Sequence, residues 1–317
     1  MGAGEFDLIA RIRARAGTRD DVVLGIGDDA ALLAPPPDRQ LVVTADTLND
    51  GVHFPRGTSP ADIGWKALAV NLSDLASMGA EPAWCTLSLS LPQGDTAWID
   101  GFLDGFLALA GEYGVALVGG DTTRGPLSIS VTAMGFVDAG RALRRDGARV
   151  GDDVWVTGTL GDAAGALALL ERDPVGVLRL RLDRPTPRVE AGRALIDVAS
   201  ACVDVSDGLL ADLGHVATRS GVGAQVEIDA LPASDALCAA FDAATRMPMQ
   251  ASGGDDYELC FTAPADARAR IAVLASSLDL RITRIGRMVP GEGVHPVRAD
   301  GDPWTPPRRG YDHFATS

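Results

Sequence analysis

Short apolar strands alternate with amphipathic helices along the whole chain, and several strands run into an aspartate beside glycine. This alternation predicts an α/β (α+β) fold in which helices pack on sheets. Helices are predicted at 5–16, 59–78, 98–113, 162–170, 187–200, 208–220 and 264–278. Strands are predicted at 40–45, 83–91, 115–118, 127–137, 153–157, 202–205, 224–228 and 258–262. The arginine-rich segment 138–151, with three glycines, indicates a junction between two domains, 1–140 and 141–317.

The charge balance excludes several classes of partner. The chain has 317 residues, 46% of them hydrophobic, which is enough for two cores of ordinary size. Its net charge of −15 argues against nucleic acids and anionic membranes as partners. No apolar stretch reaches 18 residues, and the first 15 residues resemble an amphipathic helix more than a signal peptide. We therefore predict a cytoplasmic protein.

The remaining reactive residues exclude familiar nucleotide-binding and metal motifs. No CxxC pair exists among Cys85, Cys202, Cys238 and Cys260, so buried free thiols are predicted. The four histidines show no metal-binding spacing. Lys66 is the only lysine and no glycine-rich loop precedes it, so the chain has no P-loop. HRD and DFG motifs are also absent, which excludes a protein kinase.

Six short motifs combine aspartate with glycine or a hydroxyl residue. They are GIGDD (25–29), TADT (44–47), NLSD (71–74), GGDTT (119–123), DVSDG (204–208) and SGGDD (252–256). Mg²⁺ prefers oxygen ligands and is commonly held by one or two carboxylates together with substrate phosphates. Glycine lets the backbone approach a phosphate closely and donate its N–H groups. Divalent cations would also reconcile an acidic protein with anionic substrates.

Each motif alone is better explained as an ordinary turn, because Gly-Asp and Asp-Gly are common turn pairs. From spacing alone Arg145 resembles a solvated surface charge, and His53 and Trp65 could be core or surface residues. The motifs taken together favour a site, since three of them follow buried strands and ligands bind at strand ends in open α/β sheets.

The ordered set of motifs resembles the thiamine-monophosphate kinase family. GEFDLIARI, GIGDDAALL, TADTL, DGVHF, KALAVNLSDLASMGA, GGDTTRGP, GRALRRDGARVGD, VDVSDGL, SGGDDYELCF and GYDHF follow one another from Gly4 to Phe314. The resemblance implies a two-domain fold like that of aminoimidazole ribonucleotide synthetase, whose N-terminal domains pair in a homodimer. It also implies that ATP binds without a P-loop and phosphorylates thiamine monophosphate, in the last step of thiamine diphosphate biosynthesis.

The resemblance also implies a set of site residues. It implies Mg²⁺ binding by Asp29, Thr44, Ala45, Asp46, Asp74, Asp121, Asp204 and Asp207. It implies ATP contacts from Gly120, Asp121, Arg145 and Ser206, and thiamine-phosphate contacts from His53, Asp255 and Tyr311. Asp46, Asp74, Asp121 and Arg145 are expected to be the catalytic group. The family often has glutamate at position 255. The role of Asp28, the number of ions and a monovalent-cation requirement stay open.

The acceptor phosphate suggests a mechanism without a general base. A phosphate monoester has a second pKa near 6 and is a nucleophilic dianion at neutral pH. Two dianionic groups about 4 Å apart repel by roughly 16 kcal/mol at an effective dielectric constant near 20. We therefore expect cations to screen the two substrates during direct in-line transfer, with Arg145 neutralising ATP oxygens and no phosphoenzyme.

Two alternatives stay open at this point. One is an ATP-dependent cyclase or a selenophosphate synthase of the same superfamily, although the latter usually carries an N-terminal Cys or Sec and the first cysteine here is Cys85. The other is an acidic protein that binds metal or nucleotide without turnover. ADP release with thiamine phosphate, compared with the other substrates, distinguishes them.

Overall fold

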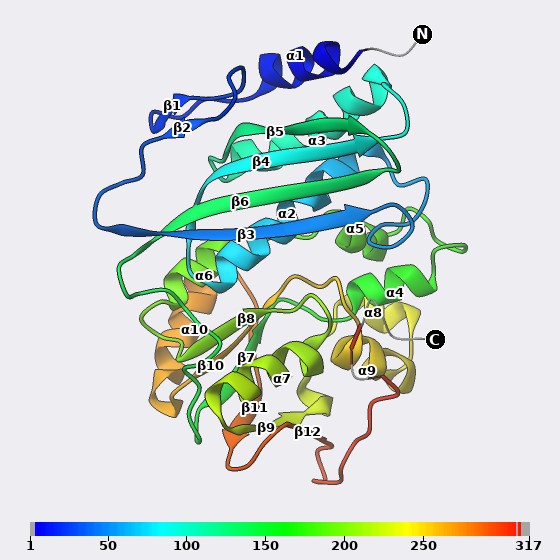
Figure 1. The fold of residues 1–317 in the computed structure, drawn as a ribbon. Helices are drawn as coiled ribbons and strands as arrows, with labels where there is room; N and C mark the ends of the chain where they lie inside the picture. The colour runs from blue at the N-terminus through cyan, green and yellow to red at the C-terminus, as the bar shows by residue number, and fades with distance from the viewer. Residues whose placement is uncertain (1–3, 309, 312–317) are drawn as a thin grey trace. The chain divides into compact units, whose positions relative to one another are not determined.

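A computed structural model describes residues 4–308 and 310–311 and divides the chain into two compact units. The N-terminal unit comprises Met1–Leu75 and Ala80–Arg141, and the C-terminal unit comprises Ala76–Gly79 and Ala142–Ser317. Figure 1 shows one open sheet with its own helices in each unit.

The N-terminal unit contains a four-stranded sheet with helices on one face and a separate two-stranded sheet formed by its first two strands. Its elements are α1 (Glu5–Arg15), β1 (Val22–Leu24), β2 (Leu32–Leu33), β3 (Arg39–Asn49), α2 (Pro60–Ser77), β4 (Glu81–Leu91), α3 (Thr96–Glu112), β5 (Ala116–Arg124) and β6 (Ser128–Asp138). The strand order is β3-β6-β4-β5, and only β4 and β5 run parallel. Helices α2 and α3 lie behind this sheet in Figure 1 and cover one of its faces.

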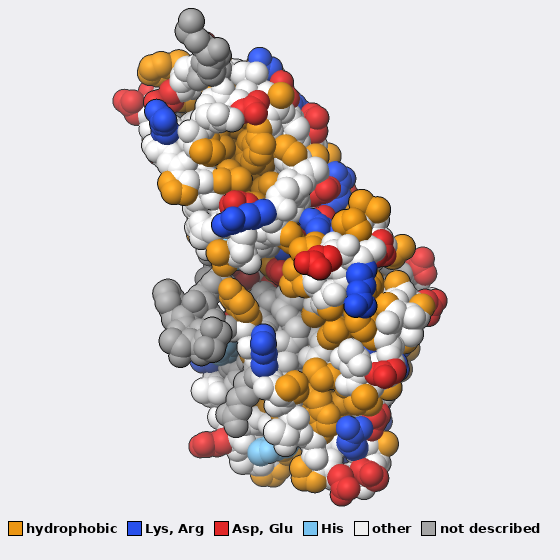
Figure 2. Space-filling view, turned by 90° about the vertical axis from the view of Figure 1, so that its right-hand side faces the viewer, with side chains coloured by type: hydrophobic (Ala, Val, Ile, Leu, Met, Phe, Trp, Pro, Cys, Tyr) orange, Lys and Arg blue, Asp and Glu red, His pale blue; other side chains and the backbone are white. Residues whose placement is uncertain are grey.

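Alternation along the strands explains why only one face is covered. In β4 the residues Leu87, Leu89 and Leu91 are buried, while the serines between them are half-buried. Side chains of a strand point to opposite faces in turn, so the leucines form the core against the helices. On the edge strand β3, Leu41 and Val43 are half exposed (50% and 56%). The second face of this sheet therefore carries apolar side chains at one edge. Figure 2 shows apolar side chains, drawn orange, gathered in several places on one face of the molecule.

Helix α1 is fastened to α3 by charged contacts. The Arg11 guanidinium donates to Asp100 at 3.1 and 2.8 Å, and Arg15 donates to Asp104 at 2.6 Å. Leu8 and Ile12 are the buried residues of α1. This short helix therefore lies in a fixed place on the unit, and its apolar face forms part of a cavity described below.

Two sequence predictions about strand ends are wrong. Asp46 and Asp121 were expected just beyond the ends of strands, but β3 continues to Asn49 and β5 to Arg124. Both aspartates therefore lie inside edge strands of a mixed sheet. The rule that ligands bind beyond the carboxyl ends of strands applies to parallel sheets and does not describe this unit. Asp204 was expected inside the strand 202–205 and is instead the last residue of its strand, which ends one residue earlier, while Asp74 lies in a helix, as expected.

The C-terminal unit has a six-stranded, mainly antiparallel sheet in the order β12-β9-β11-β7-β10-β8. Its elements are β7 (Asp153–Thr157), α4 (Asp162–Ala168), α5 (Val177–Asp183), α6 (Val189–Leu195), β8 (Ala201–Asp204), α7 (Leu209–Ser220), β9 (Gly223–Glu227), η1 (Ile228–Ala230), α8 (Asp235–Ala240), α9 (Ala243–Ser252), β10 (Leu259–Ala263), η2 (Ala265–Ala267), α10 (Arg268–Ser277), β11 (Ile282–Val289) and β12 (Val294–Val297). The sequence did not predict β1, β2, α5, α8, α9, β11 and β12, and α6 is shorter than expected.

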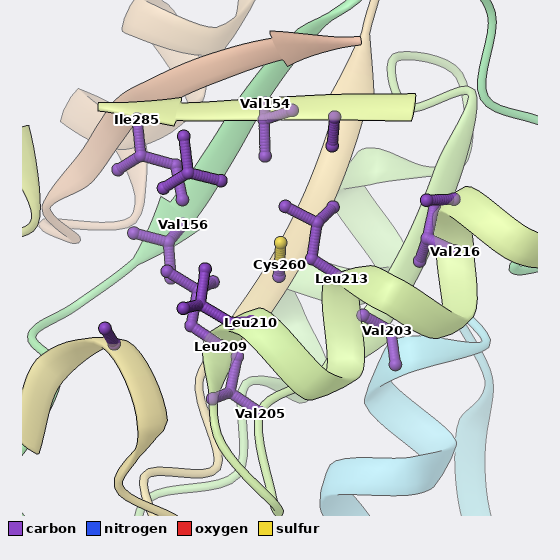
Figure 3. Close-up of a cluster of buried hydrophobic side chains, with 14 of the residues drawn as sticks. Val154, Val156, Val203, Val205, Leu209, Leu210, Leu213, Val216, Cys260 and Ile285 are labelled. Atoms are coloured by element: carbon purple, nitrogen blue, oxygen red, sulfur yellow. The ribbon is translucent and has the colours of Figure 1, made fainter. Parts of the chain in front are cut away.

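The core of this unit lies between the sheet and α7. Figure 3 shows Leu209, Leu213 and Val216 on one face of α7, pointing toward Val154 and Cys260 on the strands. The spacing of the three helix residues places them on one side of the helix. Cys85, Cys202 and Cys260 are buried free thiols, as predicted, whereas Cys238 is exposed, so the prediction is wrong for this one. None of the helices described is long and apolar enough to cross a bilayer.

A buried carboxylate at the start of β7 gives a prediction about stability. Asp153 is buried and accepts hydrogen bonds from Arg268 at 2.6 and 2.9 Å and from Arg284 at 2.7 Å. The bond from Arg268 is the main reason that the Asp153 pKa is lowered. We expect Asp153→Asn to lower the free energy of unfolding by about 2–3 kcal/mol at neutral pH, measured by urea denaturation.

The lowered pKa of Asp153 also determines how the stability of the fold depends on pH. Because the Asp153 pKa is lower in the folded chain, the stabilisation is present above its ordinary value of 3.8 and is lost as the pH falls through the lowered value. The difference between wild type and Asp153→Asn should therefore shrink below about pH 4. Exposed Asp266 provides the control, and Asp266→Asn should change the unfolding free energy little. An Asp153→Asn difference that does not depend on pH would contradict the assignment.

Candidate active site

One group of polar residues gathers where β3 faces α2 in the N-terminal unit. The Thr44 hydroxyl donates to a carboxylate oxygen of Asp74, and the Asp46 N–H donates to Asn71 Oδ1 at 3.1 Å. Thr44 and Asp46 alternate along β3 and share one face of it, while Asn71 and Asp74 are one turn apart on α2. The structure therefore brings Asp46 and Asp74, two of the predicted magnesium ligands, onto adjoining elements.

His53 belongs to the turn that follows β3. Its Nδ1 accepts the Asn49 N–H at 3.0 Å, and its carbonyl accepts the Lys66 ammonium group at 2.9 Å. Lys66 is 1% exposed and rises from α2, the helix that also carries Asp74. In the sequence this lysine indicates only that no P-loop is present. In the structure it positions the backbone of a predicted substrate contact.

A second group lines a cavity at the other edge of the sheet. The cavity has a volume of about 380 Å³ and is bounded by α1, the loop 25–31 and the segment 117–122 of β5. Asp28, Asp29 and Asp121 all line it, together with the glycines of both motifs. Gly120 has φ +144°, and a Cβ there would stand 1.9 Å from the Leu87 carbonyl oxygen, so only glycine fits. Asp29 and Asp121 therefore belong to one glycine-lined cavity.

The two groups are apart within one chain. Asp46 is in register with Val131 on β6, which pairs with Leu87 on β4, which pairs with Gly120 on β5. Three interstrand spacings of about 4.8 Å separate β3 from β5, which places Asp46 roughly 14 Å from the Gly120–Asp121 pair. Among the residues that the structure describes, no group of three or more His, Cys, Asp or Glu side chains could hold a metal ion.

In the C-terminal unit, three segments meet through their backbones. The Asp255 N–H donates to the Ser206 carbonyl at 2.8 Å, and the Tyr311 N–H donates to the Asp207 carbonyl at 3.0 Å. Glycine is needed at this meeting point, because a Cβ on Gly254 would stand 2.5 Å from the Ser206 carbonyl oxygen. The structure thus brings together Ser206, Asp207, Asp255 and Tyr311, which lie up to 105 residues apart in sequence.

The remaining predicted residues lie in separate settings. Asp204 ends β8 and is 3% exposed, next in sequence to the loop that carries Ser206 and Asp207. Arg145 is exposed, and its carbonyl accepts the Ser220 hydroxyl at 3.0 Å. Trp65, for which the sequence left core and surface open, is half-buried in α2. Positions 312–314 of the GYDHF motif lie outside the described residues.

Sequence reasoning missed Asp212, which organises the loop 206–208. One carboxylate oxygen of Asp212, in the first turn of α7, accepts the backbone N–H groups of Ser206, Asp207 and Gly208, each at 3.1 Å. Burial, and secondarily the Asp207 charge, raises the pKa of Asp212 to about 7, against the lowering effect of these bonds. The signal in the sequence was an acidic residue in a first helical turn, which stabilises helix N-termini in general.

A second missed feature is a buried ion pair under the SGGDD segment. Glu258 is fully buried and accepts hydrogen bonds from Arg188 at 2.6 and 2.5 Å, from Arg181 at 2.9 Å and from Thr157 at 2.7 Å. A buried carboxylate with this many partners fixes the backbone that carries it, because removing a partner leaves charge uncompensated. The partners of Glu258 therefore hold in place the backbone next to the segment 252–256, which carries Asp255.

Comparison with known proteins adds the family. Residues 27–137 match the family described as AIR synthase related protein, N-terminal domain, and residues 149–297 match AIR synthase related protein, C-terminal domain. The expected two-domain AIR synthase-related fold is thereby confirmed.

Individual relatives found by sequence and by structure belong to the same enzyme family. The thiamine-monophosphate kinase of Salmonella typhimurium is 50% identical to this chain over 325 residues, which cover 100% of both proteins. A crystal structure of thiamine-monophosphate kinase from Stenotrophomonas maltophilia K279a is 60% identical, with a TM-score of 0.88, and covers 95% of this chain and 98% of that one. A structure of AaThiL complexed with AMPPCP and TMP is 34% identical, with a TM-score of 0.75 and 94% coverage of both chains. The resemblance found in the sequence is thus confirmed, and the chain belongs to the thiamine-monophosphate kinase family of AIR synthase-related proteins.

Proposed function

We propose that this chain transfers the γ-phosphoryl group of ATP to thiamine monophosphate and so forms thiamine diphosphate, the last step of thiamine diphosphate biosynthesis. The observation that carries the proposal is the similarity over the full length of both chains to a thiamine-monophosphate kinase at 50% identity. The related AaThiL structure, which holds the ATP analogue AMPPCP together with TMP, supports the same pair of substrates. A cyclase or a selenophosphate synthase lacks this support.

The donor atoms of the N-terminal unit fit Mg²⁺. Asp46 and Asp74 beside β3, and Asp29 and Asp121 in the glycine-lined cavity, offer carboxylate oxygens, and Thr44 and the Ala45 carbonyl offer further oxygen. Oxygen ligands without nitrogen or sulfur are those that Mg²⁺ prefers. Asp204 and Asp207 would add carboxylates from the C-terminal unit. Bound Mg²⁺ would neutralise the phosphate oxygens and hold donor and acceptor in line.

The separation of the two carboxylate groups within one chain supports a site shared between two copies. Asp46 and Asp121 lie on the two edge strands, β3 and β5, and cannot hold the same ion within one chain across three interstrand spacings. A second copy that brings its β5 edge to the β3 edge of the first would place the two carboxylates side by side. Leu41 and Val43 on β3 are half exposed on the uncovered face beside this edge, and apolar surface of this kind is typical of an interface. We therefore propose a homodimer in which the partner copy completes each site.

The chain's other residues would bind and orient the two substrates. Gly120 and Ser206 would contact ATP through backbone and hydroxyl groups, and Arg145 would neutralise ATP oxygens. Asp255, His53 and Tyr311 would hold the thiamine phosphate. Since the acceptor is already a dianion at neutral pH, no residue needs to remove a proton, and the transfer is direct, without a phosphoenzyme.

Acceptor-dependent release of ADP tests the proposed function. We expect purified protein with ATP and Mg²⁺ to release ADP and form thiamine diphosphate when thiamine monophosphate is added, and not with aminoimidazole-ribonucleotide precursors or selenide. Because Mg²⁺ has to screen two dianions, removal of divalent cations by EDTA should reduce the rate by at least about 10³-fold, and added Mg²⁺ should restore it. Binding of ATP without any acceptor-dependent release would instead support a nucleotide-binding protein.

A further inference from the structure

Asp255 and Tyr257 share an unusual backbone conformation. Their φ angles are +67° and +50°, in the left-handed region that residues other than glycine rarely adopt. Aspartate tolerates this region better than most residues, but a bulky tyrosine there is an outlier. Such a conformation costs free energy and persists only where its surroundings hold it in place.

Hydrogen bonds hold all three residues of this segment. The N–H groups of Asp255 and Tyr257 donate to the carbonyls of Ser206 and Val205, both at 2.8 Å. Between them, the buried Asp256 carboxylate accepts the Gly161 N–H at 3.0 and 2.8 Å. The segment is therefore fixed to the loop that carries Ser206 and to the turn before α4.

The strained backbone determines where the Tyr257 side chain points. It turns Tyr257 so that its hydroxyl donates to Asp255 Oδ1 at 2.9 Å, across two residues of the same chain. The tyrosine is 8% exposed, so its ring is held by packing and its hydroxyl has a defined position. Asp255, in contrast, is only half-buried. A fixed donor thus holds one oxygen of a more accessible carboxylate.

We infer that Tyr257 is a positioning residue that sets the Asp255 carboxylate for contact with the thiamine moiety. This inference rests on the proposed function, in which Asp255 is a substrate contact. Thiamine phosphate carries a positively charged thiazolium ring and an amino group on its pyrimidine ring, and a carboxylate complements both. Aspartate is one methylene shorter than the glutamate common in the family, so its reach depends strongly on the direction in which the backbone and Tyr257 hold it.

The test is Tyr257→Phe, which removes the hydroxyl and keeps the ring. We expect the KM for thiamine monophosphate to rise about tenfold, since a hydrogen bond to a charged group is lost at the contact. The KM for ATP and kcat should stay within about twofold, because the lost hydroxyl bonds to Asp255, which is proposed to contact the thiamine phosphate and not ATP. Tyr113→Phe, which removes a tyrosine hydroxyl from the N-terminal unit, is the matched control and should leave both KM values unchanged.

A double-mutant cycle separates positioning from general damage. Asp255→Ala should raise the KM for thiamine monophosphate by at least as much as Tyr257→Phe does. In the Asp255→Ala background, Tyr257→Phe should have no further effect, because the carboxylate that it positions is gone. Additive effects of the two changes, or a wild-type KM in Tyr257→Phe, would overturn the inference.

Two further outcomes distinguish a failure of the proposed function from a failure of the positioning role. If the wild-type protein shows no ADP release that depends on thiamine monophosphate, the proposed function fails first. If Asp255→Ala raises this KM and Tyr257→Phe does not, only the positioning role fails. Should Tyr257→Phe lower the Tm by more than about 4 °C, the two KM values still test the role, because a loss of folded protein lowers the measured kcat and leaves both KM values unchanged. An unchanged KM for thiamine monophosphate in that variant would overturn the inference.

Discussion

Asp74→Asn is expected to lower kcat for thiamine diphosphate formation by about 10³-fold, and saturating Mg²⁺ should not restore the rate. The amide keeps the shape of the side chain and can still accept the Thr44 hydroxyl, but it removes a negative charge that would bind a cation. The measurement is steady-state ADP release across a range of Mg²⁺ concentrations, with thermal unfolding to show that the variant is folded.

The control lies in the same unit. Asp138, at the end of β6, has a side chain that is 68% exposed and contacts Arg39, so Asp138→Asn removes a charge of the same kind away from both carboxylate groups. Its kcat should stay within about twofold of wild type. An Asp74→Asn variant with near wild-type kcat would contradict the cation-screening mechanism.

A mixture of two inactive variants is expected to regain about one quarter of the wild-type activity, if each site takes Asp46 from one chain and Asp121 from its partner. In a heterodimer of Asp46→Asn and Asp121→Asn chains, one site carries both changes and the other carries neither. Random exchange makes half of the dimers heterodimers, and each has one intact site of two. The measurement is ADP release after the chains are mixed and allowed to exchange subunits.

The matched mixture distinguishes a shared site from general rescue. Asp46 and Asp74 lie on adjoining elements of one chain, so a mixture of Asp46→Asn and Asp74→Asn should stay inactive. Every site of that heterodimer carries one of the two changes. If the Asp46→Asn and Asp121→Asn mixture also stays inactive although subunits exchange, each site is built from a single chain and the proposed sharing is wrong.

The sequence predicted the α/β class and most elements near the sites, because strong apolar periodicity marks them. Helix α2, with Ser59 and Pro60 at its start, is an example: the helix begins at Pro60, and the Ser59 hydroxyl accepts the Asp62 N–H at 3.2 Å. Whether neighbouring strands run parallel or antiparallel could not be predicted from the sequence. The parallel-sheet rule led to the wrong placement of Asp46 and Asp121, since pairing between distant strands decides whether a sheet is mixed.

The site residues were predicted mainly from the resemblance to a known family and much less from local sequence patterns. Each aspartate motif alone matched an ordinary turn, and Arg145 looked like a surface charge. The sequence marked Asp212 only as an acidic residue in a first helical turn, and its hydrogen bonds to the loop 206–208 could not be predicted from that. No local pattern indicated the positive φ angle of Tyr257. Long-range contacts of this kind are set by the whole fold, so a sequence read segment by segment does not contain them.

The burial of Lys66 gives the folded chain an unusual chemical selectivity. Its side chain is 1% exposed within α2, and it is the only lysine among 317 residues. A lysine-specific protease or an amine-reactive reagent can therefore reach a side-chain amine only when α2 opens, and its rate at this residue reports the free energy of that opening. The protein thus contains a single-site reporter of local unfolding on the helix that carries Asp74, and a ligand that stabilises this helix would slow the reaction.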